Sequence, residues 1–203
     1  MPDTAIFLGP SLDLTTARSI LDATYLPPIK RGDLAELGPE IQTVGIVDGE
    51  FFQSLAVSPK EVLPLLDRGV KVYGSSSMGA LRAVELVPFG MIGVGAIFEW
   101  FRDGVVDADD EVALTYDPVT YRPCSEPLIN IRFALRDAVQ ERLIAQSKAN
   151  EIIQTLKQAY FPLRSYQGVC QICPELKEFI MERLPDQKRY DTLLLLRTIA
   201  GLS

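Results

Sequence analysis

Three consecutive serines, Ser75, Ser76 and Ser77, separate a short apolar stretch from a segment with helical character. A serine on a tight turn from a strand into a helix matches the nucleophile-elbow pattern G-x-S-x-G, with Ser75 in place of the first glycine. Such a turn exposes a hydroxyl, and the N–H groups that begin the helix can hold an anion. In the alternative interpretation, Ser77 only caps the helix while Gly79 and Ala80 pack on the sheet. Ser77 is the candidate nucleophile, with Ser75, Ser76, Met78 and Gly79 as candidate ligand contacts.

The chain contains no histidine. This absence excludes the Ser-His-Asp and Cys-His constellations, and it removes both the common general base and the commonest zinc ligand. A lysine can activate a serine instead. Lys60, which begins the helix before the serine turn, is the candidate lysine. We predict no metal site and no cofactor.

Arg82 lies about one turn into the helix that follows the serines, and Glu85 comes three residues later. Arg82 could reach an anion bound at the start of this helix, or it could form an ordinary ion pair. Arg31 and Asp33 lie in a segment rich in proline and glycine, and long loops in compact domains are often functional. We therefore retain all four side chains as candidate binding residues.

Two further groups have both a structural and a functional interpretation. Glu126 and Asn130 share a helix face by their spacing of four residues, either as a site pair or as a satisfied structural pair. Cys170 and Cys173 form a lone CxxC, which lacks the four ligands of a structural zinc site. It could be a redox pair at a helix start, but small semi-buried filler residues are the simpler interpretation.

Hydrophobic patterning predicts strands over residues 5–8, 43–47 and 70–73, with helices between them. The second helix has a strong start, because Ser58 can cap it and Glu61 completes a capping box. Residues 25–40 are predicted to form a long loop with little regular structure. Strands that alternate with helices imply parallel βαβ units, whose ligands bind beyond the carboxyl ends of the strands. The loops expected on that rim carry Gly9, Pro10 and Ser11, then Asp48, and finally the serine turn.

Helical patterns follow residue 121, near 125–139, 148–160, 174–184 and from 186 onward. We therefore expect an α/β fold in which a parallel, Rossmann- or flavodoxin-like sheet is followed by a helical C-terminal region. The expected domains are a core over residues 1–120 and a helical extension over 121–203.

Composition limits the class of protein. Hydrophobic residues make up 47% of the chain and charged residues 23%, an ordinary balance for a folded protein. The net charge of −7 argues against a nucleic-acid-binding role. Three cysteines are too few for a disulfide framework, and we find neither a signal peptide nor a membrane-spanning stretch. A cytoplasmic location without membrane association is expected.

A set of motifs spread over residues 5–135 resembles the TfuA-like protein family. The matching segments are Phe7-Leu8-Gly9-Pro10-Ser11-Leu12, Arg31-Gly32-Asp33-Leu34, Val44-Gly45-Ile46-Val47-Asp48-Gly49, Ser77-Met78-Gly79-Ala80-Leu81-Arg82-Ala83 with Glu85, Pro88-Phe89-Gly90-Met91-Ile92-Gly93-Val94-Gly95, and Asp110-Glu111-Val112. Where many relatives have His-Lys-Glu, this chain has Pro59-Lys60-Glu61, so the usual histidine cannot act as a base here.

The resemblance implies a partner of a YcaO-type enzyme in peptide backbone thioamidation, a post-translational modification. The TfuA-like protein would supply sulfide by hydrolysing a thiocarboxylate on a ThiS-like sulfur carrier, and would help to engage the YcaO enzyme and the precursor peptide. In that case Ser77 would be the nucleophile or would organise the oxyanion, Lys60 or Asp48 would be the base, and Arg82 would anchor the carbonyl at the carrier's C-terminus. The alternatives are a non-catalytic protein that docks on a YcaO enzyme, and nucleotide binding at the same rim. Nucleotide binding has less support, because the chain has no P-loop or GxGxxG motif.

Overall fold

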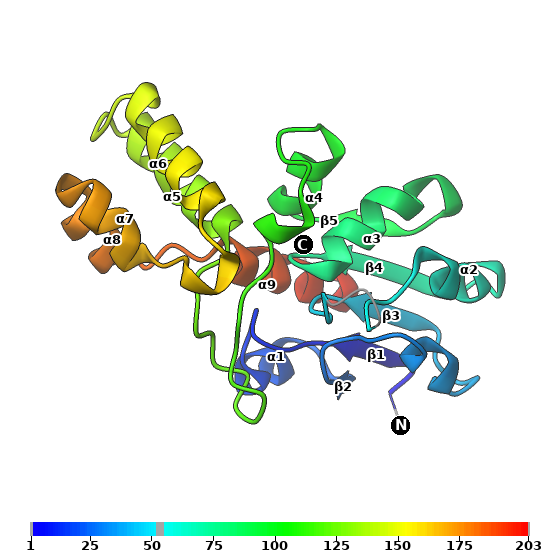
Figure 1. Ribbon diagram of the computed structural model, residues 1–203. Helices are drawn as coiled ribbons and strands as arrows, with labels where there is room; N and C mark the ends of the chain where they lie inside the picture. The colour runs from blue at the N-terminus through cyan, green and yellow to red at the C-terminus, as the bar shows by residue number, and fades with distance from the viewer. Residues whose placement is uncertain (1, 52–54, 203) are drawn as a thin grey trace. The chain divides into compact units, whose positions relative to one another are not determined.

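A computed structural model describes residues 2–51 and 55–202. Within this part of the chain, five parallel strands form one sheet in the order β2-β1-β3-β4-β5 (Figure 1). The strands are β1 (Thr4–Phe7), β2 (Thr24–Leu26), β3 (Thr43–Ile46), β4 (Lys71–Ser75) and β5 (Ile92–Val94). The predicted α/β fold with a parallel sheet and a helical C-terminal region is confirmed.

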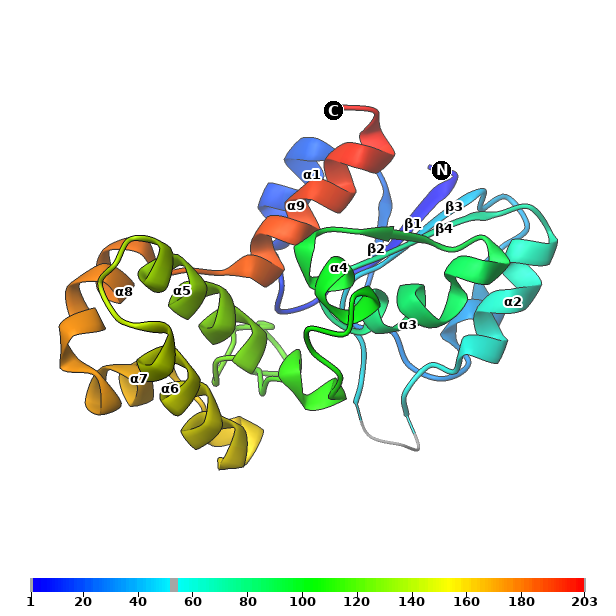
Figure 2. The same ribbon diagram turned by 90° about the horizontal axis from the view of Figure 1, so that it is seen from above.

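The strand order determines which helices cover each face of the sheet. The chain moves from β1 outward to β2, and from β3 outward through β4 to β5, so right-handed crossovers place the first helix opposite the later ones. Helices α1 and α9 lie side by side on one face, and α2 and α3 lie on the other (Figure 2). These helices and the neighbouring one are α1 (Leu14–Ile20), α2 (Pro59–Asp67), α3 (Met78–Leu86), α4 (Ala96–Arg102) and α9 (Gln187–Ala200).

Local sequence signals explain the start of α2. The Ser58 hydroxyl accepts a hydrogen bond from the backbone N–H of Lys60, and the Glu61 carboxylate accepts one from the backbone N–H of Ser58. This is the predicted capping box, which satisfies N–H groups that a helix start leaves without partners. In contrast, β2 lies partly within the segment predicted to be an irregular loop. Three residues at the edge of a sheet leave too short a pattern to detect.

A hydrophobic cluster joins α1 and α9 to the sheet. Its buried members include Ile6 and Leu8 from the β1 segment, Ala17 from α1, and Leu195 and Leu196 from α9. Gly45 on β3 favours the close approach of α9, since a Cβ atom there would lie 3.3 Å from Ile199 and 3.4 Å from Leu195 on that helix. The burial of this apolar surface fixes the last helix of the chain against the first strands.

On the opposite face, α3 approaches the sheet closely. A Cβ atom at Gly79 would lie far inside van der Waals contact of the Ile46 carbonyl oxygen on β3. Ala80 and Ala83 are fully buried beside it. The small residues after the serine turn therefore let the helix backbone pack directly on the strands.

The chain divides into two compact units, residues 1–107 with 188–203, and residues 108–187. The first is the α/β unit and the second is helical. The two units are defined by their compactness. The expected domain boundary near residue 120 concerns parts that fold independently, so it stays a prediction.

Besides α9 and the helices named above, the helical and 3-10 segments are η1 (Asp33–Glu36), η2 (Val87–Phe89), η3 (Asp109–Glu111), α5 (Leu128–Gln140), α6 (Gln146–Gln158), η4 (Phe161–Leu163), α7 (Tyr166–Ile172), η5 (Pro174–Leu176) and α8 (Lys177–Arg183).

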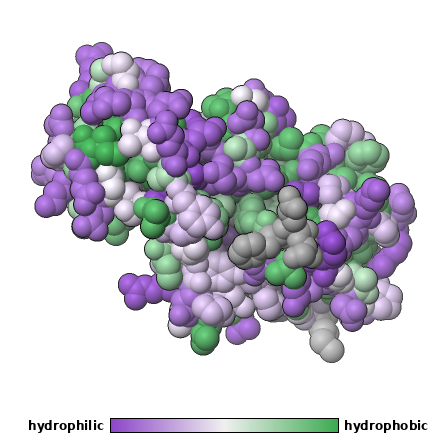
Figure 3. Space-filling view, in the orientation of Figure 1, coloured by the Kyte–Doolittle hydropathy of each residue, from purple (hydrophilic) through white to green (hydrophobic). Residues whose placement is uncertain are grey.

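Buried ion pairs connect the start of the helical unit to its helices. The fully buried Glu111 carboxylate accepts two hydrogen bonds from the Arg132 guanidinium, at 2.8 and 2.7 Å. Arg164 is buried and donates to Asp110 at 2.5 Å. Charges removed from water need such partners, so these pairs fix the Asp110-Glu111 segment to α5 and to the chain after η4. Hydrophilic residues cover most of the visible surface of this unit (Figure 3).

Across residues 2–51 and 55–202, no helix combines the length and the apolar character needed to cross a bilayer.

Candidate functional site

Asp48 is the central residue at the carboxyl ends of β1 and β3. Its Oδ2 accepts backbone hydrogen bonds from Gly9 at 2.9 Å and Ser11 at 3.0 Å, and its Oδ1 accepts the Ser11 hydroxyl at 2.6 Å. The chain leaves β1 toward one edge of the sheet and β3 toward the other, so this is the topological switch point, where ligands bind in open α/β sheets. The structure thus joins two of the three loops that the sequence placed on the rim.

Lys188, the second residue of α9, supplies a positive charge to this group. Its Nζ lies 3.7 Å from Asp48 Oδ1, and both side chains are only 3% exposed. A buried carboxylate is costly unless it is hydrogen-bonded and paired with a cation, and Asp48 has both kinds of partner. Because its oxygens already accept three hydrogen bonds, this carboxylate is suited to holding the β1 and β3 loops together.

Ser76 links the serine turn to the same group. Its hydroxyl lies 3.2 Å from the Ser11 hydroxyl and 3.0 Å from the backbone carbonyl oxygen of Lys188, and it can donate to either. Its backbone has φ +65°, a left-handed conformation that non-glycine residues rarely adopt. The sharpest point of the turn is therefore Ser76, one residue before the serine that the sequence pattern placed at the elbow.

Ser75, at the end of β4, is also engaged internally. Its hydroxyl donates to the backbone carbonyl of Asp191 on α9 at 3.1 Å. The Asp191 carboxylate accepts a hydrogen bond from the backbone N–H of Ile97 at 2.7 Å, in the first turn of α4. A carboxylate at a helix start is favourable both as a hydrogen-bond acceptor and toward the helix dipole. Asp191 thus connects α9 with the turn after β4 and with α4.

Ser77 differs from its two neighbours. It is the N-cap residue of α3 and only 1% exposed, yet its hydroxyl makes no hydrogen bond with any described residue. Arg82 Nε is the described side-chain atom that is wholly buried without a partner, so the Ser77 oxygen, which is not such an atom, retains some access to solvent. Ser77 is therefore the serine of the turn whose hydroxyl is available to a ligand.

The first amides of α3 are largely used by the protein itself. The N–H of Gly79 donates to the Val47 carbonyl at 3.1 Å, and the N–H of Ser77 donates to the Ser75 carbonyl at 2.7 Å. Ala80 donates to the Ser77 carbonyl at 3.0 Å. These three donors hold the turn in place and are not free to stabilise an oxyanion, which leaves the N–H of Met78, the first residue of α3, as the candidate donor of this helix start.

Arg82 points its guanidinium toward Glu85, with a distance of 2.9 Å between Nη1 and Oε2. This is the ion pair that the sequence left as one of two alternatives. The Arg82 side chain is 12% exposed, and its Nε is buried without a hydrogen-bond partner in the described part of the chain. The guanidinium therefore retains an unused donor, which an anionic ligand could accept.

Other predicted residues lie at the surface of the α/β unit. Lys60 is exposed in the first turn of α2. Asp33 accepts a hydrogen bond from the backbone N–H of Lys30, and the N–H of Gly32 donates to Glu61 at 2.6 Å. These contacts close the loop that carries Arg31 onto itself and onto the start of α2.

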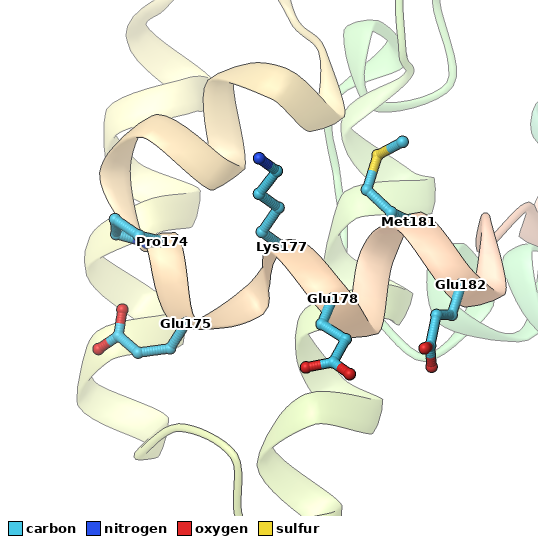
Figure 4. Close-up of a pocket in the computed structure, with 6 residues that line it drawn as sticks. All are labelled: Pro174, Glu175, Lys177, Glu178, Met181 and Glu182. Atoms are coloured by element: carbon cyan, nitrogen blue, oxygen red, sulfur yellow. The ribbon is translucent and has the colours of Figure 1, made fainter.

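The predicted pair Glu126 and Asn130 belongs to the helical unit. Asn130 donates to Glu126 at 2.7 Å and to Asp186 at 3.1 Å, so the pair shares a third polar group. The same unit has an open hollow of about 530 Å³ along α8, lined by Pro174, Glu175, Lys177, Glu178, Met181 and Glu182 (Figure 4). None of the predicted site residues lines this hollow.

The CxxC pair also belongs to the helical unit. Burial raises the pKa of the Cys173 thiol, which donates a hydrogen bond to Glu175 at 3.3 Å. A reactive thiol needs a lowered pKa instead, so the geometry favours the filler interpretation. Among the described residues, no group of three or more Cys, Asp or Glu side chains is arranged to hold a metal ion.

Sequence reasoning missed Lys188 and Asp191, which come from the last helix. A signal was available, because both share a helix face with Leu195 by their spacing of three, four and seven residues. A lysine and an aspartate on the apolar face of an amphipathic helix indicate a buried polar contact.

Comparison with known proteins bears on the same residues. A family model described as TfuA-like protein matches residues 48–165, and a search of curated proteins found no match. The matched range begins at Asp48, includes the whole serine turn and covers more than half of the chain. This protein therefore belongs to the TfuA-like family.

Proposed function

We propose that this protein is the partner of a YcaO-type enzyme in peptide backbone thioamidation, and that it supplies sulfide by hydrolysing a thiocarboxylated ThiS-like carrier. Family membership supports the YcaO partnership. The carrier, the precursor peptide and the hydrolytic step are part of the proposal. It places the reaction at the rim formed by Asp48, the Gly9–Ser11 loop and the serine turn.

The observation that carries the proposal is the Ser77 hydroxyl, which makes no hydrogen bond with a described residue while its neighbours Ser75 and Ser76 are hydrogen-bonded. A hydroxyl that makes no hydrogen bond within the protein can donate to, or accept from, a ligand. Ser77 lies in the strand-to-helix turn, one residue after its sharpest point at Ser76.

The proposed step needs no histidine. The Ser77 oxygen attacks the thiocarboxylate carbon, the carbon–sulfur bond breaks, and the Ser77 proton leaves with the sulfur as hydrosulfide. Water then hydrolyses the serine ester to the carrier carboxylate and restores the hydroxyl. We assign the unused donor of Arg82 to the carbonyl end of the carrier tail. Lys60 and Asp48 stay predicted candidates for the base, although the hydrogen bonds to Asp48 favour an organising role.

Sulfide release from a thiocarboxylated carrier tests this function directly. Ser77→Ala should lower the rate by about a hundredfold or more, as expected when a covalent nucleophile is removed. Ser19→Ala is the matched control, because Ser19 is exposed on α1 and bonds only to its own helix. Equal release by wild type and Ser77→Ala would exclude Ser77 as the nucleophile.

A non-catalytic docking role is the second candidate, and one observation favours it. The N–H groups of Ser77, Gly79 and Ala80 are already bonded to the protein's own carbonyls, so these three donors do not contribute to an open oxyanion hole. If docking is the function, the protein should still raise YcaO turnover when free sulfide is supplied in excess. If sulfide makes the protein dispensable, the hydrolytic role is favoured.

A further inference from the structure

We propose that Lys188 is a positioning residue of this site and sets the conformation of the serine turn from the last helix of the chain. The inference rests on the proposed function, because it concerns how Ser77 is held for reaction. Lys188 lies outside residues 48–165, the range that the family model matches. Neither its sequence position nor the family match assigns it a role.

Lys188 contacts the rim with two different groups. Its ammonium lies 3.7 Å from the Asp48 carboxylate, which organises the loops after β1 and β3. Its backbone carbonyl accepts the Ser76 hydroxyl, which belongs to the turn after β4. One residue therefore connects all three loops that form the rim, and α9 carries it into place because Leu195 and Leu196 pack on the sheet.

The Ser76 hydroxyl has one proton and two acceptors, the Ser11 hydroxyl and the Lys188 carbonyl. Thr192 donates to the same carbonyl at 2.7 Å, which fixes the local geometry of α9. A residue in the left-handed conformation of Ser76 persists only when its surroundings hold it there. Contacts to Ser11 and Lys188 provide that restraint, and the next residue along the chain is Ser77.

Removal of the ammonium should loosen this arrangement in a defined order. The Asp48 carboxylate would remain buried without its cation, which weakens its hold on the Gly9–Ser11 loop. Ser76 would then lose a fixed partner in Ser11, and the Ser77 hydroxyl would lose its orientation. Misplacement of a reacting group by about 1 Å can lower a rate by about a hundredfold while leaving ground-state binding intact.

The test compares Lys188→Met, which removes the charge and keeps most of the stem, with Lys188→Arg, which keeps the charge. Lys71→Met is the control, because Lys71 is an exposed lysine at the opposite end of β4. With a thiocarboxylated carrier as substrate, Lys188→Met should lower kcat by roughly tenfold to a hundredfold with little change in KM. Lys188→Arg should restore much of the loss, and Lys71→Met should match wild type.

Hydrogen exchange gives a readout that does not depend on activity. Amides of residues 75–79 should exchange faster in Lys188→Met than in wild type or Lys71→Met. If Lys188→Met unfolds, Lys188→Gln, which keeps a polar head group at the buried position, replaces it in both measurements and should fold yet show the lower kcat and the faster exchange.

The outcomes separate the two proposals. A wild-type protein that releases no sulfide refutes the proposed function. An active wild type whose kcat is unchanged in Lys188→Met, or unchanged exchange at residues 75–79 in that variant, overturns the role of Lys188. A kcat loss that Lys188→Arg does not relieve would likewise contradict a role that depends on the positive charge.

Discussion

The hydroxyl of Ser11, after the first strand, donates a hydrogen bond of 2.6 Å to the carboxylate of Asp48, after the third. The two residues are 37 positions apart, and both are buried. Strands β1 and β3 are neighbours in the sheet, so their following loops meet at the switch point. The order of the strands in the sheet therefore brings together two residues of the candidate site.

Asp48→Asn should destabilise the α/β unit, because an amide NH₂ in place of Oδ1 would face the donating Ser11 hydroxyl and the Lys188 ammonium and would leave Lys188 without its counter-charge. We expect the free energy of unfolding to fall by about 3 kcal/mol, as when one partner of a buried pair is lost. Urea unfolding measures the change. Asp67→Asn, at an exposed position on α2, should change it by less than about 0.5 kcal/mol. Equal stability of the two variants would contradict the structural role of Asp48.

Gly79→Ala should also be strongly destabilising, since the added methyl group would collide with the Ile46 carbonyl oxygen. Backbone atoms of a buried strand cannot move aside cheaply, so we expect a loss of about 3 kcal/mol or more. Thermal unfolding provides the measurement. The control is Gly168→Ala on α7, where the nearest atom would be 3.5 Å from the new Cβ. A helical glycine replaced without a clash should be neutral or slightly stabilising.

Glu111→Ala should destabilise the helical unit, because Arg132 would lose a carboxylate that is fully buried. The expected cost is about 3 to 5 kcal/mol, the range for breaking a buried ion pair by removing one partner. Glu151→Ala is the matched control, since the Glu151 side chain is 61% exposed and that of its partner Lys148 is 34% exposed. An exposed pair of this kind contributes about 0.5 kcal/mol. Circular dichroism followed during urea unfolding would distinguish the two variants.

The three cysteines should react with a maleimide in the order Cys124, Cys170, Cys173. Cys124 is exposed, Cys170 is half-buried and Cys173 is buried. Burial raises the pKa of the Cys173 thiol, so less of the reactive thiolate is present at neutral pH, and raising the pH toward 9 should speed its labelling if the fold is retained. Mass spectrometry of the labelled protein gives the order. Fast labelling of Cys173 at pH 7 would favour a redox role for the CxxC pair.

Much of the fold could be predicted from the sequence, because it depends on local patterns. Apolar runs such as Val44–Val47 marked strands, and Ser58 with Glu61 marked a helix start. The strands β2 and β5 escaped prediction, because three residues at a sheet edge carry too little pattern. Asp48 and the serine turn were found for a related reason, since polar residues directly after predicted strands must lie on the rim.

The sequence by itself determined the α/β class, the absence of any histidine and the identity of the polar residues on the rim. Only the tertiary structure decided which of those residues meet. Ser11, Asp48, Ser76 and Lys188 come from four separate segments, and no local rule states that the last helix returns to the first strands. That return results from apolar burial between α9, α1 and the sheet, a nondirectional force summed over distant residues. The same packing engages the hydroxyls of Ser75 and Ser76 and leaves that of Ser77 without a hydrogen bond to any residue that the structure describes.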